Sequence, residues 1–220
     1  MSDQSAVSER VDKRFGLIET LLWTRQEGYA LLDEHLARLA ASSAALGFEF
    51  NAQAVTMALE RIVAAAPDER LRIRLVLSRS GELETSKTPI AAIPPTTIWR
   101  VALAKNRFTA CDPFLRHKTT QRALYENELE QAMKIHGADE VLFLNERDEI
   151  CEGARVNIFV PHGEILRTPP LASGLLPGTL RARLISEGRA SEAVLLLRDL
   201  PAQFYVGNSV RGLVRATRII

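Results

Sequence analysis

The alternation of hydrophobic and polar residues predicts several strands in the first half of the chain. Residues 71–77 alternate between leucine or isoleucine and mostly basic side chains, the period-two pattern of a strand with one buried face. The apolar stretch 15–23 favours another strand, and residues 29–32 favour a short strand after a turn at Gly28. Ser80-Gly81 indicates a hairpin turn, and residues 98–103 a further strand.

Helical spacing appears between these strands. Apolar residues recur with a period near 3.6 from Leu36 to Leu46, with Asp33 as the expected N-cap and Gly47 as the expected end of the helix. Asn51 is the expected cap of a second helix, which runs to about residue 66 before Pro67.

The second half begins with an irregular stretch, residues 105–117. A helix is expected at 119–136, closed by Gly137, and a strand at 141–144. Residues 150–160 read as a pair of strands with a kink at Gly153. Pro177-Gly178 favours the start of a helix that runs to about residue 187. The last strands are expected at 194–197 and 205–206.

Strands dominate both halves and helices cluster between them, so the pattern predicts an α+β fold rather than regular βαβ alternation. We expect a flexible lead-in at 1–14 and a small N-terminal α+β domain at 15–110. A connection at 111–117 then leads to a larger C-terminal domain at 118–220.

Composition and charge exclude several classes of protein. Hydrophobic residues make up 46% of the 220 residues, too many for a mainly disordered chain. The net charge of +1, with both signs interspersed, argues against a dedicated nucleic-acid binder. The longest apolar run, residues 193–197, is too short to span a membrane, and residues 1–14 show no secretory signal. With only Cys111 and Cys151, a reduced cytoplasmic protein is expected.

Lys118 is the first candidate for chemistry. A single lysine is usually a solvated surface charge. Arg116, His117 and Arg122 lie close to it in the sequence, however, and neighbouring cations lower the pKa of a lysine and favour its nucleophilic amine. The residues alone leave both interpretations open.

Three further features could serve a ligand. Glu152 stands in a mostly apolar segment, where it could pair with Arg155 or hold a proton on a heterocyclic nitrogen. The amides of Thr179 and Leu180 follow Pro177-Gly178 at an expected helix start, which is a ready anion site. The turn Gly207-Asn208-Ser209 could face an anion as well. Each of these patterns is also common in structural roles.

Common sequence signatures are missing. The chain contains no dinucleotide-binding glycine loop, no phosphate loop and no HExxH or GxSxG motif, and its four histidines are too far apart for a local metal motif. Taken alone, these residues indicate a globular α+β protein with enzymatic activity as one option.

Taken in order, several short blocks resemble the fold-type IV pyridoxal-phosphate enzymes, also called the class IV aminotransferase family. The resemblance spans about residues 15 to 216. The blocks are Ile18-Glu19-Thr20, His35-Leu36-Ala37-Arg38-Leu39, the segment around Lys118, Glu152-Gly153 with Asn157-Ile158-Phe159, Thr168-Pro169-Pro170 to Leu176-Pro177-Gly178, and Gly207-Asn208-Ser209.

The resemblance implies the two-domain fold of the D-amino-acid aminotransferases and pyridoxal 5'-phosphate as cofactor. Lys118 would form the imine with the cofactor and shuttle the substrate proton. Glu152 would keep the pyridine nitrogen protonated, which makes the ring an electron sink. Arg74 and Ser209 fall where family members bind the substrate.

The phosphate of the cofactor would be bound by residues from both halves. The resemblance gives Arg38 a role in binding it through the guanidinium group. The amides of Thr179 and Leu180 would complete the phosphate site together with Asn208. A homodimer and a small-molecule amino substrate are also implied, with no metal, nucleic-acid or membrane partner.

Within the family, the segment around Lys118 resembles 4-amino-4-deoxychorismate lyases, which release pyruvate and form 4-aminobenzoate on the folate route. Arg122 and Asn208 match that branch. Branched-chain aminotransferases usually have tyrosine where this chain has Ala123. The alternatives are an aminotransferase for branched-chain or related amino acids and a degenerate, non-catalytic member. The sequence assigns no role to His117 or Tyr125.

Overall fold

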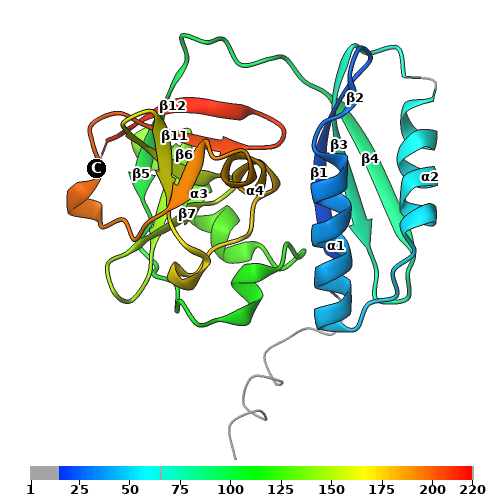
Figure 1. Cartoon of the computed structure of the whole chain (residues 1–220), viewed down its shortest axis with the longest axis horizontal. Coiled ribbons are helices and arrows are strands. Elements are labelled where there is room, and N and C mark those ends of the chain that lie inside the picture. The colour runs from blue at the N-terminus through cyan, green and yellow to red at the C-terminus, as the bar shows by residue number, and fades with distance from the viewer. Residues whose placement is uncertain (1–14, 65, 220) are drawn as a thin grey trace, which may run out of the picture.

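A computed structural model describes residues 15–64 and 66–219 and shows two domains side by side (Figure 1). The lead-in expected at 1–14 lies outside the described residues. Each domain is built on one β-sheet, and helices lie beside both sheets, so the predicted α+β class is confirmed. No helix in the described ranges is long and apolar enough to cross a membrane.

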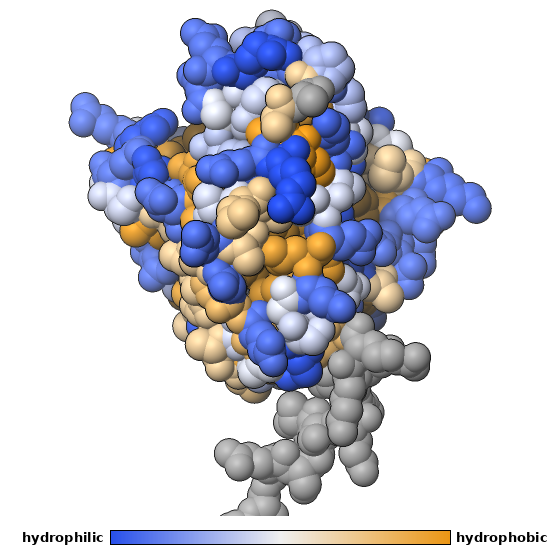
Figure 2. Space-filling model, turned by 90° about the vertical axis from the view of Figure 1, so that its right-hand side faces the viewer, coloured by the Kyte–Doolittle hydropathy of each residue, from blue (hydrophilic) through white to orange (hydrophobic). Residues whose placement is uncertain are grey.

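The first domain holds a four-stranded antiparallel sheet in the order β2-β1-β3-β4. Its elements are β1 (Leu17–Thr24), β2 (Gly28–Tyr29), α1 (Leu32–Leu46), α2 (Ala52–Val63), β3 (Arg70–Leu77) and β4 (Leu83–Pro89). The outer side of this domain mixes charged residues with small hydrophobic patches (Figure 2).

The alternation predicted for residues 71–77 is confirmed and gives this sheet two different faces. Leu71, Ile73 and Leu75 are fully buried and form one core with Leu39 of α1 and Leu59 of α2. Both helices therefore cover this face. The arginines of β3 point to the opposite face, which turns toward the second domain.

The two helix starts differ from each other in how well the sequence predicted them. Asn51 caps α2 as expected, because its side chain accepts a hydrogen bond from the amide of Ala54 at 3.0 Å. The prediction for α1 was wrong: the cap is Leu31, in a left-handed conformation with φ 54°, and Asp33 lies inside the first turn. There its carboxylate favours the helix through the helix dipole rather than as a cap.

The second domain contains an eight-stranded mixed sheet in the order β10-β9-β8-β11-β12-β5-β6-β7. Its strands are β5 (Ile98–Leu103), β6 (Glu140–Leu144), β7 (Ile150–Gly153), β8 (Asn157–His162), β9 (Ile165–Thr168), β10 (Ala190–Glu192), β11 (Phe204–Asn208) and β12 (Gly212–Arg218). Helices α3 (Ala123–His136) and α4 (Thr179–Ser186) pack beside it.

The change from one sheet to the other comes earlier than expected. Strand β5, which the sequence assigned to the N-terminal domain, pairs in parallel with β12 and β6 of the second sheet. The chain crosses between the domains in the segment between β4 and β5, which runs over the top of the molecule in Figure 1. This crossover contains Pro94 and Pro95, whereas the connection expected at 111–117 lies within the second domain.

One predicted strand near the C-terminus was wrong, and three strands were not predicted. Residues 194–197 form no strand: Leu195 is buried in the core, Leu196 makes only an isolated bridge to Glu149, and a short 3-10 helix begins at Leu197. Leu195 and Leu197 of this hydrophobic run pack in the core of the second domain instead of pairing with a neighbouring strand. Strands β9, β10 and β12 were not predicted, because each is short or carries arginines and is stabilised by partners distant in sequence.

Candidate active site

A cavity of about 1400 Å³ lies between the two domains. The first domain contributes residues of β1, α1 and β3, and the second contributes the segment before α3, the end of β7, the start of α4 and the turn after β11. Seven of the eight predicted site residues line it: Arg38, Arg74, Lys118, Glu152, Thr179, Asn208 and Ser209.

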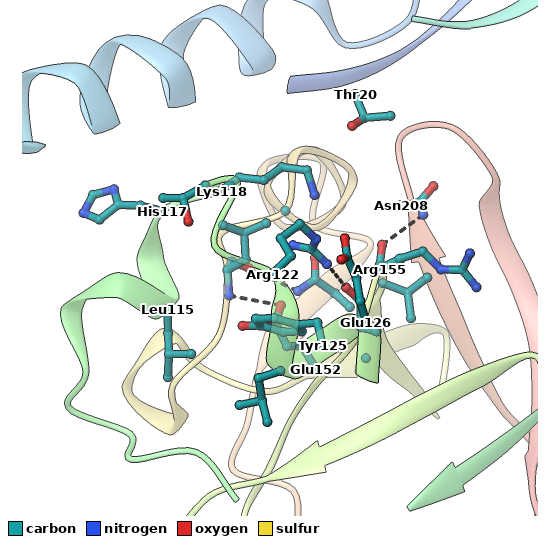
Figure 3. Close-up of a pocket in the computed structure, with 18 of the residues that line it drawn as sticks. Thr20, Leu115, His117, Lys118, Arg122, Tyr125, Glu126, Glu152, Arg155 and Asn208 are labelled. Atoms are coloured by element: carbon teal, nitrogen blue, oxygen red, sulfur yellow. Dashed lines mark hydrogen bonds between the residues drawn. The ribbon is translucent and has the colours of Figure 1, made fainter. Parts of the chain in front are cut away.

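Lys118 is held at the seam between the domains by its backbone. Its carbonyl accepts a hydrogen bond from the amide of Ile18 at 2.7 Å, and Thr119 pairs with Leu17 of β1. Helix α3 therefore starts at Ala123 and not at Thr119, because residues 118–120 are extended beside β1. The side chain of Lys118 reaches over the cavity (Figure 3).

Glu152 lies deeper in the same cavity, at the end of β7. It is buried, with 5% of its surface exposed, and both carboxylate oxygens are occupied. Oε1 accepts from the hydroxyl of Tyr125 at 3.0 Å, and Oε2 accepts from the amide of Leu176 at 3.1 Å. The guanidinium of Arg122 lies over the ring of Tyr125 at 4.8 Å (Figure 3). These contacts fix the carboxylate in one orientation.

Burial moves the pKa values of Lys118 and Glu152 toward each other. It lowers the pKa of Lys118 to about 7, with further lowering by the charges of Arg122 and Arg38. It raises the pKa of Glu152 to about 7, against the opposing effects of the Leu176 amide and the Tyr125 hydroxyl. A neutral amine and a readily protonated acid thus coexist near neutral pH, a pattern concentrated at functional sites.

A buried ionic cluster joins α1 to β1 at the other end of the cavity. Arg38 donates from Nε to Oε1 of Glu19 at 2.9 Å and from Nη2 to Oε2 at 2.5 Å, and Nδ1 of His35 lies 2.5 Å from Oε2. Burial alone would raise the pKa of Glu19. The charge of Arg38 and the hydrogen bonds from both partners outweigh it and lower the pKa to about 2.

This cluster reaches the start of α4 in the second domain. Nη1 of Arg38 donates to the carbonyl of Pro177 at 3.2 Å, and Nε2 of His35 lies 3.3 Å from Oγ1 of Thr179. Gly178 is the N-cap, and no side chain in the described ranges caps the helix. The first amides of α4 therefore remain available at the cavity, next to a guanidinium group.

Gly178 is the residue that makes this approach of helix and sheet possible. A Cβ atom at this position would lie 1.9 Å from Oδ1 of Asn157, far inside the limit of a real contact. Asn157 is itself fixed by a hydrogen bond from Nδ2 to the carbonyl of Leu176 at 3.1 Å. The segment before α4 is thus shaped for close packing on β8, and its amides face the cavity.

The turn between β11 and β12, which contains Asn208 and Ser209, forms a further side of the cavity. Oδ1 of Asn208 accepts from the amides of Val210 and Arg211 at 3.0 and 2.9 Å, and its Nδ2 donates to the carbonyl of Arg155. Ser209 donates to the carbonyl of Thr20 at 3.2 Å and so ties the turn to β1. Both predicted residues line the cavity, but their side chains already serve this turn and the domain seam.

The eighth predicted residue, Leu180, does not line the cavity. Its side chain packs near Phe159 and Leu184, so only its backbone amide can serve a ligand. Sequence reasoning did not single out Glu19 and His35 for the ionic cluster, although both stand in the blocks that carry the family resemblance. The three-residue spacing between His35 and Arg38 on one helix face was the available signal.

Comparisons with known proteins agree with this geometry. The profile of the family described as amino-transferase class IV matches residues 16–219. The chain belongs to the class IV aminotransferase family. A candidate aminodeoxychorismate lyase of Schizosaccharomyces pombe is 27% identical over 179 residues, which cover 80% of this chain and 75% of that protein.

Solved structures of similar proteins show the same fold. A crystal structure of a candidate amino-acid aminotransferase from Mesorhizobium loti is 40% identical, with a TM-score of 0.88 over 93% of this chain and 100% of that one. A hypothetical aminotransferase from Mycobacterium tuberculosis in its PLP-bound form is 22% identical, with a TM-score of 0.78 over 98% and 84% of the two chains. The predicted fold type IV is confirmed.

Class IV aminotransferases are pyridoxal-phosphate enzymes, so the predicted cofactor and the assignment as an enzyme are confirmed as well. The cavity fits that cofactor chemically. It combines a lysine with a lowered pKa, a buried carboxylate and the uncapped start of α4 beside an arginine. These groups match an aldehyde, a heterocyclic nitrogen and a phosphate, respectively.

Proposed function

We propose that this enzyme is a 4-amino-4-deoxychorismate lyase, which converts its substrate into 4-aminobenzoate and pyruvate. The observation that carries the proposal is the pairing of Lys118 and Glu152 in one cavity, in a chain related over four-fifths of its length to a candidate lyase. Arg122 and Asn208, which match the lyase branch, both line that cavity. The same side chains would serve any member of the family, so the substrate requires a direct test.

Lys118 and Glu152 have complementary roles in this proposal. When bound, pyridoxal phosphate supplies an electron sink for charge that develops beside the substrate amine. Lys118 would hold the cofactor until the substrate amine displaces it, and its freed amine, which the lowered pKa keeps neutral, would then take the proton from the carbon that bears the substrate amine. Glu152 holds the proton of the ring nitrogen. Its two hydrogen-bond donors, Tyr125 and Leu176, keep the carboxylate in place.

The reaction balances with no further reactant. Lys118 accepts the proton, and the bond between the ring and the enolpyruvyl oxygen breaks, so that the ring becomes aromatic. The released enolpyruvate takes up a proton and becomes pyruvate. Aromatisation makes the elimination favourable, and the enzyme has only to orient the substrate and move protons.

At the opposite end, we assign phosphate binding to Arg38, the amides of Thr179 and Leu180, and the turn at Asn208. Arg38 is held rigidly by Glu19, which leaves its guanidinium beside the start of α4. A phosphate there would meet amide donors and a positive charge together.

The pH dependence of cofactor uptake should reveal the unusual lysine. Only the neutral amine of Lys118 reacts with an aldehyde, and its pKa is about 7 rather than 10.5. The rate at which the cofactor-free protein takes up pyridoxal phosphate should therefore rise with pH and level off just above pH 7. Stopped-flow absorbance between pH 6 and 10 measures this. A rate that continues to rise tenfold per pH unit up to pH 10 contradicts it.

Replacing Arg38 with glutamine should weaken the binding of pyridoxal phosphate about tenfold to hundredfold, the usual effect of losing charge-assisted hydrogen bonds. The affinity for pyridoxal, which lacks the phosphate, should stay within about twofold. Titration of both ligands measures the difference. Arg61→Gln, on the exposed end of α2, serves as control. Equal losses for both ligands would instead show a general defect in the cavity.

The decisive assay supplies aminodeoxychorismate to the cofactor-loaded protein and measures released pyruvate. Pyruvate and 4-aminobenzoate in equal amounts support the lyase. An aminotransferase is the second candidate, favoured by the 40% identity to the Mesorhizobium loti protein. It predicts instead that leucine or glutamate converts the loaded enzyme to the pyridoxamine form without pyruvate. Sizing chromatography tests the predicted homodimer.

A further inference from the structure

Glu140, the first residue of β6, is a buried acid that takes no part in the proposed reaction. Its side chain is fully buried, and Oε1 accepts hydrogen bonds from the amides of Val141 and Ala154, both at 3.0 Å. Within the described part of the chain, Oε2 has no hydrogen-bond partner, and Nε of Arg155 lies 3.6 Å from it. An apolar side chain would fill this space at a lower cost of desolvation, which indicates that the acceptor oxygen itself matters.

The residues that follow Glu152 form a tight turn, residues 153–156, which packs against Glu140. The amide of Gly153 donates to the carbonyl of Val156 at 2.8 Å and closes the turn. A Cβ atom on Gly153 would lie 3.1 Å from Cγ of Glu140, so glycine lets the turn approach the acid closely. The turn lines the cavity whereas Glu140 does not, and the acid therefore supports the turn from behind.

On its cavity side, the 153–156 turn binds two side chains of the site through its carbonyls. Nη2 of Arg122 donates to the carbonyl of Ala154, and Nδ2 of Asn208 donates to the next carbonyl at 3.0 Å (Figure 3). Among the residues that the structure describes, no acidic side chain forms an ion pair with Arg122. Its position therefore depends on this carbonyl and on the ring of Tyr125. Ala154 links the two ends, because its amide is held by Glu140 and its carbonyl holds Arg122.

The position of Arg122 matters because its charge acts on Lys118. After burial, this charge is the largest of the effects that lower the pKa of Lys118. The ring of His117 lies against Ser42 instead, with Nδ1 3.0 Å from Oγ. The charged groups that act on the amine of Lys118 come from four parts of the chain: Arg122, Arg38 of α1, Glu19 of β1 and Glu152 of β7.

We propose that Glu140 is a positioning residue of the active site, which holds Arg122 near Lys118 through the 153–156 turn. The inference rests on the role proposed for Lys118 and deepens it. Glu140 acts through its reach to the amide of Ala154 and not through its charge. The two effects have opposite signs. Loss of a negative charge alone would lower the pKa of Lys118, whereas a displaced Arg122 would raise it.

Glu140→Asp and Glu140→Gln separate reach from charge. Aspartate keeps the charge but withdraws the oxygens by one methylene, and glutamine keeps the length and an acceptor oxygen without the charge. The measurement is the pH midpoint of pyridoxal-phosphate uptake, which follows the pKa of Lys118 at about 7. Stopped-flow absorbance should show the midpoint raised by about 0.5 unit or more in the aspartate variant and not raised in the glutamine variant. If the aspartate variant does not fold, Glu140→Met replaces it, since methionine fills the space without an acceptor.

A double variant tests whether Glu140 acts through Arg122. Arg122→Gln alone should raise the midpoint by about one unit, because it removes the charge. Addition of Glu140→Asp should then raise it no further, since both substitutions remove the same effect. Shifts that add in the double variant would overturn the proposal.

Glu128→Asp is the matched control. Glu128 is also a buried acid that accepts hydrogen bonds from backbone amides, those of Lys105 and Asn106 at 3.0 Å, but it lies outside the cavity. Its variant should lose stability to urea and keep the midpoint. The same result for Glu140→Asp, or a midpoint raised in Glu140→Gln, overturns the proposal. A wild-type rate without a midpoint near pH 7 overturns the role of Lys118 itself, and with it this inference.

Discussion

Replacing Lys118 with alanine should abolish the visible absorbance of lysine-bound cofactor and lower turnover by about 10³-fold or more, because one amine both binds the cofactor and moves the proton. Its position in the cavity supports this double role. The backbone of Lys118 is fixed by Ile18, and its side chain reaches the space above Glu152 and Arg122. No other lysine lines the cavity among the described residues.

Two measurements make this result interpretable. Absorbance spectra of the purified variant, with pyridoxal phosphate added, report the covalent bond, and pyruvate release reports turnover. Lys134→Ala on the exposed side of α3 is the control and should retain both. A yellow Lys118→Ala protein would contradict the assignment. A wild-type protein that takes up no cofactor would instead favour a degenerate, non-catalytic family member.

Replacing Glu152 with glutamine should lower turnover by about 10²-fold to 10³-fold, a typical loss when a group that stabilises developing charge is removed. The amide has nearly the same shape as the carboxylic acid but cannot hold the ring nitrogen in its protonated form. Pyruvate release at saturating cofactor measures the effect. Glu130→Gln, on the exposed face of α3, should leave turnover unchanged. Normal turnover in the Glu152 variant would exclude this role.

The same variant should have an opposite effect on the stability of the cofactor-free protein. The folded pKa of Glu152 is raised from 4.5 to about 7, so ionisation destabilises the folded state progressively as pH rises through this range. Glutamine cannot ionise. Between pH 4 and 8, the wild type should therefore lose on the order of 3 kcal/mol relative to Glu152→Gln. Hydrogen bonds lost by the variant affect both pH values alike. Urea unfolding at both measures the change, and a constant difference would contradict it.

Local patterns predicted the elements whose partners are close in sequence. Asn51 at the start of α2 and the alternating leucines of β3 carry their structural signal within a few residues. The start of α4 directly after Pro177-Gly178 was predicted from local sequence in the same way. Lys118 and Glu152 were found through the order of short blocks, because neither residue type alone distinguishes a reactive group from a structural one.

Interactions between segments that are far apart in the sequence could not be predicted from local patterns. Residues 118–120 have the composition of a helix start, yet they are extended because Gly16 and Ile18 supply backbone partners 100 or more residues away in the sequence. Strand β5 pairs with β12 for the same reason. Asp33 failed as a cap since Leu31 adopts a left-handed conformation, which residue type does not favour.

The hydrogen bond from Ile18 to the carbonyl of Lys118 has a consequence for how this enzyme moves and folds. The reactive amine belongs to one half of the molecule, but its main chain is an additional rung on the sheet of the other half. A hinge that swung the halves apart would pull the amine away from Glu152. Substrate entry must therefore rely on side-chain and turn motion, and the two halves should melt in a single cooperative transition.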